Sequence, residues 1–144
     1  MYIPEVPINS LTKEIKEIVD LVEQLKENRR FVFNEPALND DIIKWEKTNN
    51  VSIPESYADW LRFSNGSIIR GSLAEFYGLN EIEINVDGFP EDYVIIGELV
   101  GDGVILCFSK GSGKIFTDDH GKVAEYDNFN EILEELIYDL NAMW

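Results

Sequence analysis

The sequence is poor in cysteine and in basic side chains, and each shortage narrows the possible function. It contains one cysteine, which excludes an internal disulfide framework and a multi-cysteine zinc site and fits a reducing compartment. Only 12 basic residues stand against 28 acidic ones, so the formal net charge is -16. A surface this acidic repels phosphate, which disfavours direct nucleic-acid binding and favours a basic partner protein.

Long apolar runs are also missing, and we expect no leader sequence. No run approaches the roughly 20 apolar residues that a membrane-spanning helix requires. Residues 1–5 lack the basic start and apolar stretch of a signal peptide. We therefore expect a cytoplasmic protein with no membrane partner.

The sequence does contain enough apolar material for a folded domain. Of its 144 residues, 44% are hydrophobic and 12% are aromatic, which excludes a wholly disordered chain. No linker or repeat divides the chain. We expect one domain over residues 1–144, with a lead-in and first helix in residues 1–36 and the motif-bearing region in residues 37–144.

The acidic excess is concentrated in the second half of the chain. Residues 1–70 carry 12 acidic and 9 basic side chains, whereas residues 71–144 carry 16 acidic and 3 basic ones. Two interpretations are open at this stage: an evenly solvated surface, or a face of one sign that steers a cationic partner.

Hydrophobic periodicity predicts helices at both ends of the chain. Residues 10–27 carry apolar side chains at helical spacing, and Ser10 is placed to cap the first turn. Residues 129–140 form one apolar stripe, preceded by Asn128, which has the spacing of a capping box with Glu131.

Two shorter helices are expected between them. One passes through residues 42–45 and stops at residues 49–50, a pair of asparagines. The next has Pro54 as its first helical residue, continues through residues 57–64 and ends at a left-handed stop in residues 65–66, Asn-Gly.

The remaining segments are typical of strands. Residues 31–33 predict a strand or an anchoring loop, and short strands or extended loops are expected at 67–76 and 80–86; clearer strands are expected at 93–98, 104–108, 114–116 and 122–126. The turns between the last four are short and glycine-rich, which forces antiparallel neighbours. The predicted fold class is α+β: an antiparallel β-sheet meander flanked by N-terminal helices and closed by a C-terminal helix.

Few residues offer catalytic chemistry. Residues 111–114, Gly-Ser-Gly-Lys, fail as a phosphate loop because Phe108 stands at the earlier glycine position and Ile115 replaces the hydroxyl residue. Cys107 lies in an apolar run that should be buried, and His120, the single histidine, lies in a polar turn. We therefore predict no catalytic residue and no cofactor.

The acidic clusters leave other roles open. Carboxylate oxygens suit a hard cation such as calcium, and they occur together at Asp118 and Asp119 and in the group Glu81, Glu83 and Asp87. The twelve-residue calcium-loop pattern is absent. Two carboxylates brought together in space also suit hydrolysis. With so many acidic residues, a solvated surface is the favoured interpretation, and no metal site is predicted.

An ordered set of short motifs runs through most of residues 37–140. Residues 53–66 read Ile-Pro-Glu-Ser-Tyr-Ala-Asp-Trp-Leu-Arg-Phe-Ser-Asn-Gly, and residues 76–82, 98–103 and 129–136 follow in order. This set resembles the SUKH superfamily, which unites fungal cell-wall regulators with bacterial immunity proteins; residues 1–36 do not align with it. The positions that match the family's fold motif are Pro54, Tyr57, Leu61, Asn65, Gly66 and Gly101.

The resemblance implies a binding function. Many bacterial members are similar to immunity proteins that neutralise a toxin, often a nuclease or a nucleic-acid deaminase with a basic substrate groove, and a strongly acidic inhibitor suits such a groove. The fungal members imply the alternative of a regulatory adaptor that binds a signalling partner. We predict that the partner-binding acids lie in protruding turns and loops: Glu81, Glu83, Asp87, Glu91, Asp92, Asp102, Asp118 and Asp119.

Overall fold

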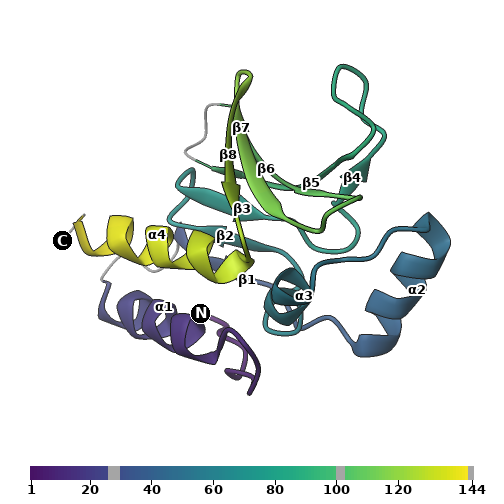
Figure 1. The fold of residues 1–144 in the computed structure, drawn as a ribbon. Helices are drawn as coiled ribbons and strands as arrows, with labels where there is room; N and C mark the ends of the chain where they lie inside the picture. The colour runs from purple at the N-terminus through teal and green to yellow at the C-terminus, as the bar shows by residue number, and fades with distance from the viewer. Residues whose placement is uncertain (26–29, 100–102, 143–144) are drawn as a thin grey trace.

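The computed structural model describes residues 1–25, 30–99 and 103–142 (Figure 1). Within these ranges the helices are α1 (Thr12–Gln24), α2 (Asn39–Asn49), α3 (Glu55–Leu61) and α4 (Phe129–Ala142). The strands are β1 (Val32–Phe33), β2 (Ser67–Ile69), β3 (Ala74–Phe76), β4 (Glu83–Ile84), β5 (Tyr93–Leu99), β6 (Val104–Ser109), β7 (Ile115–Asp119) and β8 (Lys122–Tyr126).

The strands form one antiparallel sheet in the order β1-β2-β3-β5-β6-β7-β8. Strand β4 pairs with the first half of β5, on the edge that β3 occupies further along β5. From β5 to β8 the chain is a meander, because each connecting turn is too short for a crossover. The α+β prediction is confirmed.

The helices lie on one side of this sheet. Figure 1 shows α1, α3 and α4 together below the sheet, with α2 apart at its edge, while the β7–β8 hairpin and the β4–β5 loop rise on the other side. Helices α1 and α4 pack side by side. Their apolar stripes and the inward side chains of the strands form one large core, which includes Ile15, Leu133 and Val94.

Aromatic rings fill the centre of that core. Trp60, on α3, packs edge-on against Phe63 and Phe76, and Phe76 packs edge-on against Phe129 at a centroid distance of 5.1 Å. The sequence predicts that the aromatic residues Tyr57, Trp60, Phe63, Phe108, Phe116 and Phe129 face the core, and all but Phe116 lie in this core. Phe116 differs: it is buried, but on the opposite face of the sheet, because its neighbour Ile115 takes the core-facing position in β7.

Two predicted details at the start of α1 and of α3 are wrong. The hydroxyl of Ser10 does not cap α1 but donates to the buried carboxylate of Asp59 at 2.5 Å, while Asn9 Oδ1 accepts from the backbone N–H of Leu11. Pro54 is the residue before the helix, with φ -53° and ψ 137°, so α3 begins at Glu55.

The helix ends also differ from expectation. Helix α1 ends at Gln24, because Leu25 is already extended. The predicted stop at residues 49–50 is confirmed: α2 ends at Asn49, and Asn50 is left-handed, with φ 53°. Gly66 also has positive φ, 105°, but α3 has already ended at Leu61, so Gly66 shapes the entry into β2 rather than the helix end.

One of the two hydrogen bonds of the predicted capping box at α4 is present. Asn128 Oδ1 accepts from the backbone N–H of Glu131 at 3.4 Å. The carboxylate of Glu131 accepts from the backbone N–H of Asp127 rather than from Asn128, so the reciprocal bond is displaced by one residue.

Candidate functional site

The face of the sheet opposite the helices is the candidate site, and we call it the open face. The helices contribute their buried side chains to the main core, whereas the cluster on the open face contains side chains from strands and loops alone, among the described residues. In Figure 1 the β4–β5 loop and the β7–β8 hairpin flank this face. Strand and loop side chains, and no helix of the described residues, therefore cover the buried cluster on this face.

Strand register arranges the open face in rows, because cross-strand partners share a face. One row crosses the sheet from β1 to β8: Val32, Ile68, Glu75, Glu98, Ile105, Asp118 and Val123. The neighbouring row runs from β4 to β8: Glu83, Ile95, Cys107, Phe116 and Glu125. The second row is apolar in the middle and has a carboxylate at each end.

The middle of the open face is an apolar floor, in which the half-buried Tyr77, Val86, Tyr93 and Ile105 pack against Ile95, Cys107 and Phe116, which are at most 6% exposed. Aromatic rings extend it toward the β4–β5 loop. Tyr93 packs edge-on against Phe116 at 4.6 Å, and Phe89 stacks on Tyr93 at 6.0 Å. Phe89 is 39% exposed, so the floor reaches solvent at this end.

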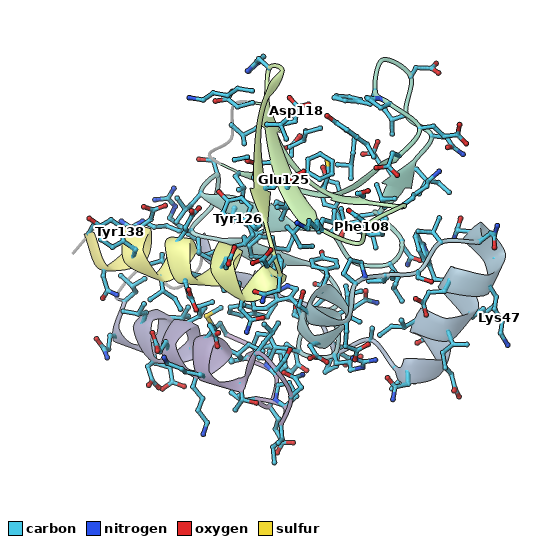
Figure 2. All side chains as sticks on the ribbon, viewed as in Figure 1. Lys47, Phe108, Asp118, Glu125, Tyr126 and Tyr138 are labelled. Atoms are coloured by element: carbon cyan, nitrogen blue, oxygen red, sulfur yellow. The ribbon has the colours of Figure 1, made fainter. Side chains whose placement is uncertain are left out.

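Carboxylates surround the apolar floor. Glu75 and Glu98 stand directly opposite each other on β3 and β5, and both are half-buried. Figure 2 shows Asp118 and Glu125 on the β7–β8 arm. The phenol of Tyr93 donates to Asp118 Oδ2 at 3.0 Å, which fixes that carboxylate at the border of the floor.

This charge pattern shifts the pKa values of nearby groups. Partial burial, followed by the charges of Glu81 and Glu98, raises the pKa of Glu75. Partial burial and four surrounding glutamates raise the pKa of Tyr77 to about 12, so its phenol is neutral at physiological pH. Both shifts report negative charge concentrated around Tyr77.

Basic side chains do not neutralise this charge within the described ranges. The ion pairs found there join Arg62 to Glu55 and Asp59, and His120 to Asp119. None of these reaches the carboxylates of Glu75 or Glu98. The open face thus combines an apolar floor with carboxylates that lack a described cationic partner.

The acids that the sequence predicts to bind a partner lie in separate parts of the structure. Glu83 and Asp118 lie on the open face, and Asp87 and Glu91 lie exposed in the adjoining β4–β5 loop. Asp119 faces the other way and contacts His120 Nδ1 at 2.9 Å.

Two of the predicted acids hold turns together. Glu81 Oε1 accepts from the backbone N–H of Gly78 at 3.1 Å. Asp92 accepts from the hydroxyl of Ser109 and the backbone N–H of Gly111. Asp102 and the motif residue Gly101 lie outside the described residues.

Three acids of the open face, Glu75, Glu98 and Glu125, are not among those predicted from the sequence. The prediction places the partner-binding acids in loops, although the alternation of side chains along a strand indicates which strand residues face away from the core. In β3, Glu75 stands between the buried Ala74 and Phe76, so its side chain must point to the other face.

The motif residues have structural roles. The Tyr57 ring is fully buried, and its hydroxyl donates to the carbonyl oxygens of Tyr77 and Ile96. Asn65 Oδ1 accepts from the backbone N–H of Leu79 at 2.8 Å. These bonds tie α3 and the segment that follows it to β5 and to the residues that follow β3.

Cys107 and His120 lie in different settings, the first buried and the second exposed. Burial, with a smaller effect of Asp118, raises the pKa of the Cys107 thiol to about 12, so it is a poor nucleophile at neutral pH. His120 lies exposed in the β7–β8 turn. Across residues 1–25, 30–99 and 103–142, no group of three or more His, Cys, Asp or Glu side chains is arranged to hold a metal.

A polar cleft of 410 Å³ lies at α2 and is a second candidate. It is lined by Asp41, Lys44, Trp45, Thr48, Asn49, Asn65, Leu79 and Asn80. The amides of Asn49 and Asn65 already bond the backbone, at Trp45 and Leu79. The cleft therefore has fewer free polar groups than its lining suggests. In the described part of the chain, no helix is long and apolar enough to cross a membrane.

Comparison with known proteins supports the motif set. The model of the SMI1 / KNR4 family (SUKH-1) matches residues 36–135, the stretch from just before α2 into α4. No curated protein matches the chain. Helix α1 precedes the matched stretch, yet its Leu11, Ile15 and Ile18 are buried in the same core as the matched residues.

Proposed function

Because the chain belongs to the SMI1 / KNR4 family (SUKH-1), we propose that it is a bacterial immunity protein that binds and occludes a toxin domain. Family membership supports a role in protein binding, as the motif resemblance implied. The toxin would be a nuclease or another nucleic-acid-modifying protein with a basic substrate groove. The immunity protein would act in the cytoplasm, where such a toxin meets its substrate.

The observation that carries this proposal is the open face, with its apolar floor and surrounding carboxylates. The half-buried Tyr77, Tyr93 and Ile105 and the 39% exposed Phe89 present apolar surface beside these carboxylates, which is typical of an interaction site. A net charge of -16 draws a basic groove toward it and competes with phosphate for that groove. Inhibition would follow from blocking access to the groove, without turnover and without a cofactor.

Co-expression tests the proposal. A toxin domain, where one is encoded directly upstream of this gene, is produced with and without the protein, and cell survival and a co-purifying complex are scored. We expect survival and a stable complex with the protein present. Cell death despite normal levels of folded protein would refute the immunity function.

A regulatory adaptor is the second candidate, favoured by the fungal members that share the motif set. It would use the same surface to bind a basic segment of a signalling protein. Gene order separates the two: a toxin gene directly upstream favours immunity, and its absence favours the adaptor.

A further inference from the structure

The Glu75–Glu98 pair is unfavourable for folding. Like charges on directly opposite residues of neighbouring strands destabilise a sheet. Here the two carboxylates face each other across β3 and β5 in a half-buried setting, with Glu81 adding to the negative charge at Glu75. Within the described ranges no lysine or arginine lies in salt-bridge distance of either carboxylate.

A small hollow opens beside Glu75, on the side of β1 and β2 and away from Glu98. It has a volume of 130 Å³ and is lined by Glu75 and Glu81, by the apolar Val32 and Ile68, and by Asn34, Gly66 and Ser67. Its mixture of carboxylates and aliphatic wall matches a long cationic side chain, whose stem is apolar and whose tip is charged.

We propose that the open face is the docking surface for a basic protein, which places a lysine or arginine side chain between Glu75 and Glu98 and an apolar side chain on the floor beside them. This inference rests on the proposed function in one respect: the toxin is the basic protein. Charge complementarity identifies the occupant, because a cation removes the repulsion that the free protein retains.

The surroundings of the pair favour arginine over lysine. A planar guanidinium bonds two carboxylates at once, and it also stacks on an aromatic face. Tyr77 supplies such a ring, since it follows Glu75 by two residues, is half-buried and packs against the open-face cluster. Ile105 is half-buried and stands opposite Glu98 on β6, so an apolar anchor and a cation are bound side by side.

The test uses variants of equal charge and a probe that needs no toxin. The double variant Glu75→Gln/Glu98→Gln removes the pair without changing its shape, and Glu17→Gln/Glu23→Gln removes the same charge from exposed positions on α1. The probe is a blocked eight-residue peptide of alternating arginine and leucine. Its affinity is measured by calorimetry, and its position by backbone amide shifts in NMR spectra.

We expect the peptide to shift amides of β3, β5 and β7. Its affinity should fall about tenfold in the open-face variant, which corresponds to the loss of one charged contact, and less than about twofold in the α1 variant. The open-face variant should also melt higher, by roughly 1–4 °C, because the repulsion is gone. A rise in stability together with a loss of binding cannot come from misfolding.

Other outcomes overturn the inference. They are no binding to the wild-type chain, equal losses in the two double variants, shifts confined to α1 and α4, or a lower melting temperature in Glu75→Gln/Glu98→Gln. The co-expression experiment tests the immunity function independently of the docking surface. A chain that binds the peptide here but does not protect against the upstream toxin refutes the immunity function and leaves the docking surface standing.

Discussion

The hydroxyl of Tyr57 donates a hydrogen bond to the carbonyl oxygen of Tyr77 at 2.5 Å. Tyr57 belongs to the buried face of α3, and Tyr77 directly follows β3 and borders the apolar floor on the other side of the sheet. One bond therefore connects the helix layer to the open face. The motif tyrosine positions the candidate site without being part of it.

Removing this bond should destabilise the fold. Tyr57→Phe leaves a buried carbonyl short of a donor and should cost about 1–2 kcal/mol; Tyr57→Ala also leaves a cavity and should cost about 3–5 kcal/mol. Urea unfolding measures both. Tyr138→Ala is the control, because Tyr138 is 75% exposed and such positions change stability by about 0.5 kcal/mol or less. Normal stability with lost toxin binding would instead place Tyr57 in the interface.

Gly66 should tolerate no side chain, for two separable reasons. Its φ of 105° strains any L-residue, and an added Cβ would lie 2.8 Å from Asn34 Nδ2 and 3.3 Å from the backbone nitrogen of Gly78. Gly88 has a similar φ of 91° but nothing within 4 Å of an added Cβ. Thermal melts should therefore show a larger loss for Gly66→Ala than for Gly88→Ala, and a still larger one for Gly66→Val. Equal losses in the two alanine variants would show that crowding plays no part.

Acid pH should abolish the benefit of removing the Glu75 charge. Partial burial and the carboxylates of Glu81 and Glu98 raise the pKa of Glu75 in the folded state. Folding therefore favours protonated Glu75, and this contribution to stability is lost as pH rises through the raised pKa. Glu75→Gln should melt higher than the wild type at pH 7. The difference should vanish below about pH 4, where glutamate is protonated in both states. A gain independent of pH would show that charge is not its cause.

The sequence predicts the antiparallel order of the strands better than it predicts which side of each strand faces the helices. Short turns such as residues 111–114 leave no alternative to antiparallel pairing, so β5 to β8 follow from the sequence. Which face of each strand the helices cover depends on long-range packing, which residue type alone does not encode. The sequence therefore predicts Phe116 in the main core and does not predict Glu75 as a binding residue, although each lies on the open face. Ser10 failed as a cap for the same reason, since its partner Asp59 is distant in sequence.

Cys107 and His120 should be dispensable for protection. The thiol is buried and its pKa is raised to about 12, and the imidazole lies exposed in a turn. A protein that acts by occlusion needs neither a nucleophile nor a base. The double variant Cys107→Ser/His120→Ala should protect co-expressing cells as well as the wild type does, provided that its circular dichroism and melting temperature show a folded chain. Loss of protection from a folded double variant would point to catalysis.

Acids on the open face should control the rate at which the toxin associates. Glu83 and Glu125 end the second row of that face, and their reversal to lysine should slow association roughly tenfold at low salt, because such charges act through steering. Glu17 and Glu23, exposed on α1, form the matched control pair. Glu14 is unsuitable, since it is 7% exposed and accepts a hydrogen bond from Asn130.

Stopped-flow association with the toxin domain, at low and high salt, measures this difference. Raising the salt shortens the range of the charges, from about 10 Å at 0.1 M to about 3 Å at 1 M. The wild-type rate should therefore fall steeply and approach that of Glu83→Lys/Glu125→Lys. Dissociation should change less than association, because both positions lie at the border of the apolar floor, where charges remain hydrated. Equal slowing by the two pairs of reversals, or a rate indifferent to salt, would mean that net charge alone attracts the toxin and that the open face does not guide it.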